Sequence, residues 1–409
     1  MEEWKIYKLG EITSKIGSGA TPKGGKDSYL GGNIALIRSQ NVLDFSFSKS
    51  GLAYINEMQA EKLNNVEVYE KDVLLNITGD SVARVCIVPN NVLPARVNQH
   101  VAIIRGNEKV DYRYLLYYLQ YIKPQLLSLS QGGATRNALT KKMIEELEIK
   151  MPSKGTQKEI VSILYTLDTK IALNRRINDN LEQQAQALFK SWFVDFEPFK
   201  DGKLVESEMG MIPEGWKYIK LGKLCESVSI THPQKTGKLI FLNTGDIECG
   251  MVNKHNYMNI NEMPGQAKKS IKENDILYSE IRPCNKHYAF VNFSADEYIV
   301  STKLMVIRTY NNNSLRIYQF LTRKEIIDLL QHEAESRSGT FPQIRFDNIS
   351  DLDILLATEP IEKQYSHLIS GIYNKVFKNE LEISKLQQLR DCILPKLMSG
   401  ELKINDLNC

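Results

Sequence analysis

Seven short loops contain the polar and charged side chains of this sequence that are best suited to binding a ligand. Each combines Arg, Lys, Asn, Gln, Ser or Thr with Gly or another small residue. Arg suits the acceptors of guanine, and Asn or Gln suits the donor and acceptor of adenine, while Ser, Thr and backbone amides suit phosphates. Small residues let the backbone approach a ligand closely. Any one loop is equally well explained as a plain turn, but together they are typical of a nucleic-acid-binding face.

Six of these loops form pairs at equivalent places along the chain. The loops are 17–26, 38–41 with 243–246, 76–81 with 278–282, and 131–137 with 336–340. The candidate DNA-binding residues that we take from these loops and their flanks are Ser18, Thr21, Lys23, Lys26, Arg38, Gln40, Asn41, Thr78, Arg84, Thr135, Arg136, Asn137, Asn243, Thr244, Arg282, Lys286, Arg337, Thr340 and Gln343.

The usual catalytic patterns are missing. Segment 17–26 fails as a phosphate-binding loop, because Ala20 replaces a required glycine and Asp27 follows the lysine. No Pro-Pro dipeptide occurs, so the Asn/Asp-Pro-Pro-aromatic motif of amino-methyltransferases is absent. No Pro precedes Asp, as a restriction-type nuclease site requires, and the histidines lack HxH or HxxxH spacing. We therefore expect no catalytic residue, no metal and no cofactor on this chain.

An internal duplication must position the loops. Segment 69–74 matches 272–277 and segment 97–105 matches 300–308, both at an offset of 203 residues. Each copy is expected to be a mixed α/β module, with short strands at 73–75, 85–88 and 101–104 and a helix over 111–130. The order is module, helix, module, helix, which predicts an α+β protein with two similar α/β domains.

Two long helices follow the modules. Apolar residues recur at alternating steps of four and three from 157 to 192, and the same pattern returns 205 residues later. Helices of roughly 35–40 residues would be about 50–60 Å long. Such a stripe must be buried, and the simplest partner is the other copy, packed antiparallel about a pseudo-twofold axis. The stripe residues are Ile160, Leu164, Leu167, Ile171, Asn174, Leu181, Leu188, Ile372, Val376, Asn379, Ile383, Leu386 and Ile393.

Asn174 and Asn379 hold equivalent positions in this stripe. A buried polar residue there would fix the register of a coiled coil, whereas the alternative is that both lie solvated at its edge.

Length and composition agree with this organisation. The 409 residues accommodate recognition domains at 1–152 and 213–358, helical regions at 153–197 and 359–409, and a linker at 198–212. The net charge is only +3, and no segment is strongly basic. Six cysteines without a CxxC pair, and no apolar run of about 18 residues, predict a cytoplasmic protein that does not enter a membrane.

The whole chain resembles the specificity subunit of type I restriction-modification enzymes. The blocks that carry the resemblance are 4–10, 188–196, 210–216 and 394–402, at both module starts and both helix ends. It implies two target-recognition domains that read a split, asymmetric DNA site through the major groove, with an antiparallel coiled coil that sets the spacing. It also implies partners, namely double-stranded DNA, two modification subunits and the restriction subunits. S-adenosylmethionine, ATP and magnesium would then be bound by those partner subunits.

Two other classes stay open on the sequence alone. One is a single-chain enzyme with an unrecognised site, and the other is a non-catalytic protein-interaction scaffold built from duplicated modules.

Overall fold

The computed structural model describes residues 4–22, 29, 31–131, 137–252, 256–311, 313–337 and 341–403. The chain forms two compact units, of which the first contains Met1–Ala172 with Ile383–Cys409 and the second contains Leu173–Glu382. Each unit therefore holds one α/β domain and a part of both long helices. Within the described residues, none of the helices has the length and apolar character needed to cross a membrane.

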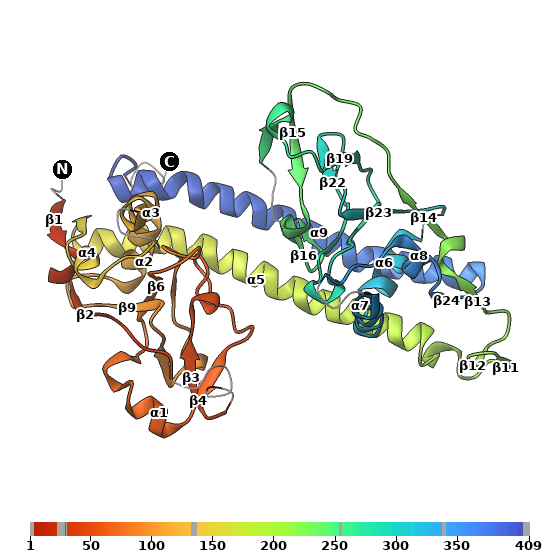
Figure 1. The fold of residues 1–409 in the computed structure, drawn as a ribbon, viewed down its shortest axis with the longest axis horizontal. Helices are drawn as coiled ribbons and strands as arrows, with labels where there is room; N and C mark the ends of the chain where they lie inside the picture. The colour runs from red at the N-terminus through yellow and green to blue at the C-terminus, as the bar shows by residue number, and fades with distance from the viewer. Residues whose placement is uncertain are drawn as a thin grey trace. The chain divides into compact units, whose positions relative to one another are not determined.

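Domain 1 contains two four-stranded sheets (Figure 1). One sheet has the order β2-β9-β6-β7, and the other has the order β4-β3-β8-β5, in which β3 and β8 are parallel. Strand β1 pairs with β10 and so joins the start of the domain to its end. The elements are β1 Lys5–Lys8, β2 Thr13–Ser18, β3 Ile34–Ile37, β4 Ala53–Ile55, α1 Glu57–Glu61, β5 Glu67–Val68, β6 Val73–Asn76, β7 Val85–Ile87, β8 Ala95–Val97, β9 Val101–Gly106, α2 Tyr112–Tyr121, α3 Lys123–Gln131, α4 Lys141–Glu145 and β10 Glu148–Met151.

Domain 2 repeats the strand order of both four-stranded sheets and adds a short β16–β17 hairpin. Its sheets have the orders β14-β23-β20-β21 and β18-β15-β22-β19, with β15 and β22 parallel, and β13 pairs with β24. The elements are β13 Lys217–Lys220, β14 Cys225–Val228, β15 Lys238–Leu242, β16 Ile247–Glu248, β17 Met251–Val252, β18 Tyr257–Asn259, β19 Ala267–Ser270, β20 Ile276–Ser279, β21 Tyr288–Phe290, β22 Tyr298–Ser301, β23 Leu304–Thr309, α6 Ser314–Thr322, α7 Lys324–Arg337, α8 Phe346–Ser350 and β24 Asp353–Leu356. The predicted pair of similar α/β domains is confirmed.

A buried ion pair is repeated with the topology. Arg105 donates two 2.7 Å hydrogen bonds to the fully buried carboxylate of Asp72, and Arg308 makes the same two bonds to Asp275. These hydrogen bonds hold the pKa of each arginine above its ordinary value. Both pairs link the turn before one central strand to the neighbouring central strand. Each pair therefore holds the same end of its sheet together.

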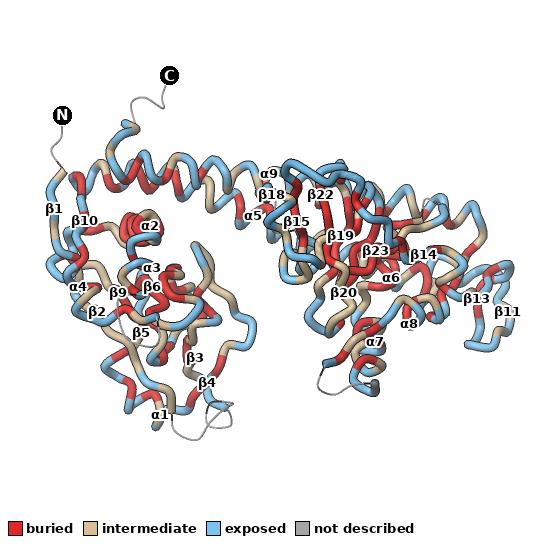
Figure 2. The backbone as a smooth tube through the Cα atoms, turned by 45° about the horizontal axis from the view of Figure 1, so that its top comes forward, coloured by how far each residue is buried: buried red, intermediate tan, exposed pale blue. Residues whose placement is uncertain are grey.

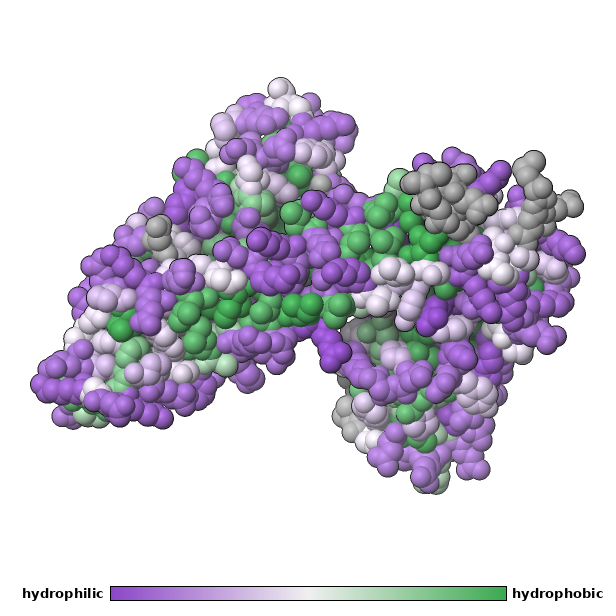
Figure 3. All heavy atoms as spheres, turned by 180° about the vertical axis from the view of Figure 1, so that it is seen from behind, coloured by the Kyte–Doolittle hydropathy of each residue, from purple (hydrophilic) through white to green (hydrophobic). Residues whose placement is uncertain are grey.

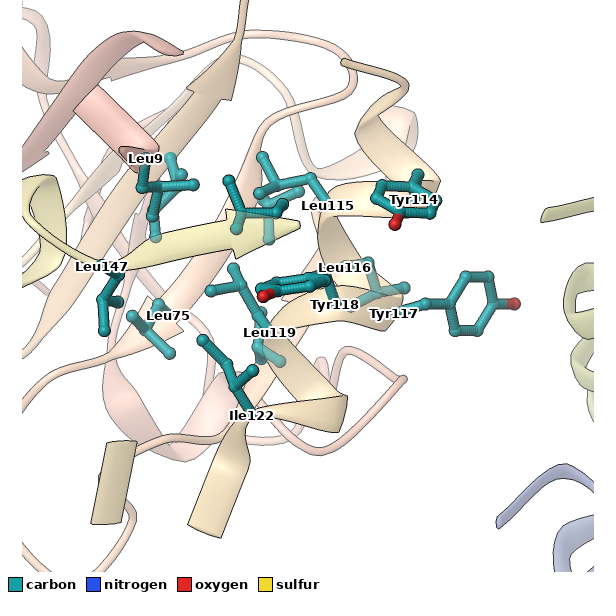
Figure 4. Close-up of a cluster of buried hydrophobic side chains, with 14 of the residues drawn as sticks. Leu9, Leu75, Tyr114, Leu115, Leu116, Tyr117, Tyr118, Leu119, Ile122 and Leu147 are labelled. Carbon is teal, nitrogen blue, oxygen red and sulfur yellow. The ribbon is translucent and has the colours of Figure 1, made fainter. Parts of the chain in front are cut away.

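Helix α2 covers the sheet of β2, β9, β6 and β7. Figure 4 shows Leu115 and Leu119 on the side of α2 that faces Leu9, Leu75 and Leu147, while Tyr117 points the other way. The sequence predicted one helix over 111–130, but α2 ends at Tyr121 and α3 begins at Lys123. Pro124 explains the break, because it lacks an N–H donor and is tolerated only in the first turn of a helix.

The two long helices are α5, Lys154–Phe193, and α9, Glu359–Ser399. In unit 1, Asp168 of α5 accepts a 2.8 Å hydrogen bond from Arg390 of α9. In unit 2, Asn178 of α5 donates to the carbonyl of Val376 in α9. The contact that lies later in α5 is made with the residue that lies earlier in α9. The predicted antiparallel pairing is therefore confirmed.

Asn174 and Asn379, the two asparagines of the stripe, are both buried. This rejects the alternative that they lie solvated at the edge of the coiled coil. Asn174 is 1% exposed and donates to Glu382 Oε2 at 2.8 Å, and Asn379 is 2% exposed and donates to Asn178 Oδ1 at 2.7 Å. Each asparagine thus links α5 to α9 through a directed hydrogen bond inside unit 2.

The other stripe residues also lie inward, and buried residues follow one side of each long helix in Figure 2. Ile160, Leu164, Ile171, Val376 and Ile383 are buried, whereas Leu167, Leu181, Leu188, Ile372, Leu386 and Ile393 are half-buried. The stripe serves two partners, since Ile160 and Leu164 also belong to the core of domain 1. Most of the face drawn in Figure 3 is hydrophilic, with hydrophobic side chains gathered in smaller groups. Exposed hydrophobic residues of the two long helices include Leu173, Leu381 and Leu389.

An aromatic cluster joins α5 and α9 to the start of domain 2. Phe193 lies 4.7 Å from Tyr365 and 5.6 Å from Trp216 between ring centroids. The cluster therefore brings together aromatic residues of the 188–196 block and Trp216 of the 210–216 block. The segment between α5 and β13, predicted to be a linker, contains a hairpin of β11 Leu204–Ser207 and β12 Gly210–Pro213.

Candidate nucleic-acid interface

Loops from four parts of domain 1 surround an open hollow of about 680 Å³. Segments 39–40, 78–84 and 137–138 and the residue before β9 form its wall. The lining residues are Ser39, Gln40, Thr78, Gly79, Asp80, Ser81, Arg84, His100, Asn137 and Ala138. Of the predicted contact residues, the structure brings Gln40, Thr78, Arg84 and Asn137 together here.

Two buried asparagines hold this wall in shape. Asn76, at the end of β6, donates to the carbonyls of Ser39 and Val42. Asn41 accepts from the amide of Arg38 and donates to the carbonyls of the 48–50 turn. Because Asn41 is fully buried, it is not a DNA-contacting residue, and this corrects the sequence prediction.

A chain of polar side chains crosses the hollow's edge. Thr21 donates to Gln99 Oε1, and Gln99 Nε2 lies 3.1 Å from His100 Nε2. His100 Nδ1 in turn lies 2.5 Å from Thr78 Oγ1. The tautomer of the imidazole therefore sets whether the Thr78 hydroxyl donates to His100 or accepts from it.

Domain 2 builds the equivalent loop with the same backbone bonds. Gly79 N donates to Asn137 O at 3.2 Å, and Arg282 N donates to Pro342 O at 3.2 Å. The bridge between Thr78 and Ala138 likewise has a counterpart between Ile281 and Gln343. Both loops span the same number of residues, from Asn76 N bonded to Arg84 O and from Ser279 N bonded to His287 O.

The side chains on this shared backbone differ. At the offset of 203, Arg282 stands for Gly79, Lys286 for Ala83, His287 for Arg84 and Lys303 for His100. Residues 79, 83, 282 and 286 all have positive φ, so the backbone is left-handed at the same two positions in each loop. One frame therefore presents two different sets of polar groups.

Arginines that stabilise the fold form ion pairs, whereas two of the candidate contact arginines do not. Arg96, Arg105, Arg308, Arg316 and Arg390 each have a carboxylate partner. By contrast, the Arg84 and Arg282 side chains have no hydrogen bond or ion pair within the described residues.

Lys269 likewise has a structural role. Burial lowers its pKa, and its Nζ donates to Thr302 O and Leu304 O. Elsewhere among the described ranges, no three His, Cys, Asp or Glu side chains gather in a way that would hold a metal ion.

The remaining predicted residues lie as follows. Ser18 ends β2, and Arg38 is held by Gly51 O at 2.6 Å. Asn243 accepts from the amide of Thr244 in the turn after β15, while Arg282, Lys286 and Gln343 meet in the loop cluster of domain 2. Arg337 is the last residue of α7, and its side chain is outside the described part. Lys23, Lys26, Thr135, Arg136 and Thr340 also lie outside the described residues.

The family of type I restriction modification DNA specificity domains matches this chain twice, over residues 1–183 and 213–389. The chain belongs to this family.

The specificity subunits that resemble this chain match either its whole length or a part of it. The chain is 25% identical to the type I restriction enzyme MjaIX specificity subunit of Methanocaldococcus jannaschii, covering 99% of this chain and 95% of that protein. It is 36% identical over 181 residues to the HindI specificity subunit of Haemophilus influenzae, covering 44% of this chain and 39% of that protein. The fold also matches the S subunit from M. genitalium, with a TM-score of 0.55, 12% identity and coverage of 97% and 96%.

Two residues around the hollow of the first specificity domain, His100 and Ala138, lie outside the contact loops that the sequence predicted. Ser39, Gly79, Asp80 and Ser81 lie within the predicted loops 38–41 and 76–81, although they are not among the candidate contact residues. His100 was within reach, because it lies in the repeated segment 97–105, opposite Lys303 in 300–308. A polar residue that changes type between two otherwise matching repeats was the available signal.

Proposed function

We propose that this chain is the DNA-recognition subunit of a type I restriction-modification system, in which each domain reads one part of a split, asymmetric site. The observation that carries the proposal is the repeated loop frame with exchanged polar groups, Gly79 and Arg84 in one domain against Arg282 and His287 in the other. Equal backbones with different donors and acceptors suit two different half-sites in the major groove.

The antiparallel helices would set the gap between the half-sites. A 40-residue helix is about 60 Å long, and half-sites on one face of DNA recur about every 34 Å. The directed hydrogen bonds of Asn174 and Asn379 would hold the register on which that gap depends.

Catalysis would lie with partner subunits in the cytoplasm. Two modification subunits would bind S-adenosylmethionine and transfer the methyl group, and restriction subunits would use ATP and magnesium. The net charge of +3 supports this division, because a nearly neutral chain gains little from phosphate neutralisation and needs partners to enclose the duplex.

Sequencing the methylated bases of cells that express this chain with its modification subunits tests the proposal. We expect a two-part asymmetric motif with a fixed gap, absent from cells that express the modification subunits alone. A continuous motif, or no motif, would contradict it. Methylation or cleavage of DNA by the purified chain alone would instead support the single-chain enzyme, and the absence of sequence-selective binding in the assembled complex would support the scaffold.

A further inference from the structure

Arg282 occupies a backbone position that side chains rarely adopt. Its φ is +44°, and the equivalent Gly79 has a φ of +74°. A left-handed conformation is unfavourable for an ordinary residue, whereas glycine adopts it freely. Domain 1 therefore uses the residue that the backbone favours, and domain 2 uses an arginine at that position.

The loop around Arg282 is firmly anchored. The amide of Arg282 donates to Pro342 O, and Asn285 N donates back to Arg282 O at 2.8 Å. Cys284 N donates to Gln331 Oε1 on α7 at 3.1 Å, and Pro283 is buried beneath the turn. The arginine is thus an exposed side chain on a fixed base, which limits the entropy lost when it binds.

The same position in domain 1 is open. A Cβ placed on Gly79 would meet no atom within 4 Å, and Gly79 lies on the wall of the hollow. A side chain at this position would therefore enter the surface that Thr78, Arg84 and Asn137 share. By equivalence, the Arg282 guanidinium enters the corresponding surface of domain 2.

We propose that Arg282 is a specificity-determining residue, which reads a guanine in the half-site bound by domain 2. This rests on the proposed function of the two domains. A guanidinium on a fixed base donates two parallel hydrogen bonds to guanine O6 and N7, and no other base offers that pair of acceptors in the major groove. Domain 1 has glycine at this position and reads its half-site with Thr78, Arg84 and Asn137 instead.

The test measures methylation by the complex of the full chain with its modification subunits, on a DNA library in which each base of both half-sites is varied. Arg282→Gly is expected to reduce the preference for guanine at one position of one half-site by about 10- to 100-fold. The other half-site and the gap should not change. The melting temperature should be equal or higher, because glycine relieves the left-handed backbone.

Three further variants keep the result interpretable. Asn274→Gly changes another exposed left-handed residue of domain 2, at the start of β20, and should leave the preference intact. Arg282→Lys keeps the charge but loses the paired donors, so it should lose most of the guanine preference. Lys286→Ala removes an equal charge from the same loop and should weaken all sequences alike.

Uniform weakening by Arg282→Gly, or an unchanged base preference, would overturn the assignment. So would a lower melting temperature with an intact preference, since that is the result of a structural role. If the complex with the unsubstituted chain showed no half-site preference at all, the proposed function itself would fail. Failure of the Arg282 assignment and failure of the proposed function are therefore distinguishable.

Discussion

Asp168 in α5 accepts a 2.8 Å hydrogen bond from Arg390 in α9, and the same carboxylate accepts a 2.6 Å bond from Tyr117 in α2. The Arg390 guanidinium also lies 3.7 Å from the centroid of the Phe45 ring. One carboxylate thus connects both long helices to the body of domain 1. Unit 2 has Tyr373, Ala185 and Gln319 at the equivalent positions when α6 is aligned with α2 from its first residue. There Gln319 donates to the carbonyl of Ala185 at 2.9 Å, so the link through a carboxylate is particular to unit 1.

Asp168→Asn should lower the free energy of unfolding by about 2 kcal/mol, because Arg390 would keep its charge in a site that is 8% exposed but lose one of its two charged acceptors, the other being the more exposed Asp391. Chemical denaturation measures the change. Lys363→Ala, which breaks an exposed pair with Glu359 on α9, should change the value by no more than about 0.5 kcal/mol and serves as the control. Equal losses in the two variants would contradict the assigned role of Asp168.

A buried charged pair in domain 2 has uncharged residues at the equivalent positions of domain 1. Arg316 binds Glu362 at 2.7 Å with both side chains buried, and Tyr114 and Gln157 stand at those positions, where they bind backbone groups. Glu362→Gln should cost about 3–5 kcal/mol, since the Arg316 guanidinium would lose its buried counter-charge. The double variant Arg316→Tyr with Glu362→Gln introduces the two domain 1 residues and should be less destabilised than the single variant.

Denaturant midpoints of the two variants and the parent protein test this. A double variant that is as unstable as Glu362→Gln would show that the surroundings, and not the charge, distinguish the two domains.

Glu380 on α9 gives a pH dependence. Burial, followed by the charge of Glu182, raises its pKa from 4.5 to about 7, while a hydrogen bond from Asn292 acts in the opposite direction. The folded protein therefore holds a proton that the unfolded chain releases. The stability is fully present below pH 4.5 and is lost as the pH rises toward 7.

Glu380→Gln should remove this part of the pH dependence and, at pH 8, raise the free energy of unfolding by about 2 kcal/mol. Denaturation at pH 5 and pH 8 measures it. The exposed Glu359→Gln on the same helix is the matched control and should leave the slope unchanged. A slope that persists in Glu380→Gln would assign the proton to another group.

The spacer can be shortened without touching either domain. Removing residues 174–180 and 379–385 takes one heptad from each helix and keeps the apolar stripe in phase. Leu181 and Leu386 then take the places of Asn174 and Asn379, so that the apolar stripe and the remaining Asp168–Arg390 pair hold the register. The helices would shorten by about 10 Å, so the gap in the methylated motif should shrink by about three base pairs at roughly 3.4 Å each. Both half-sites should stay the same. A changed half-site with an unchanged gap would refute the spacer role.

The sequence revealed the architecture because the architecture is repeated. The offset of 203 residues carries the Asp72–Arg105 pair onto Asp275–Arg308, and the heptad pattern marks α5 and α9 over almost their full length. Both signals are periodic, and periodicity survives in a single sequence. The break at Pro124 was missed because a proline fits the first turn of a new helix as well as it ends an old one.

The candidate site was less predictable. Asn41 has the composition of a contact residue, but whether its amide faces DNA or the interior depends on the 48–50 turn that folds over it. Likewise, nothing local to Arg38 indicates that Gly51 O will hold its guanidinium. Residues that meet only through tertiary structure leave no local pattern.

The composition of unit 1 has a consequence for synthesis of the chain. Leu394, Leu397 and Met398 of α9 belong to the same core as Leu9 and Ile12, and Gly400 lies against Trp4. Domain 2 obtains its α9 segment soon after it is made, whereas the core of domain 1 must wait until domain 2 and most of α9 have been synthesised. Domain 1 therefore completes its core after domain 2, although it precedes domain 2 in the chain, and its apolar side chains stay exposed for longer during synthesis.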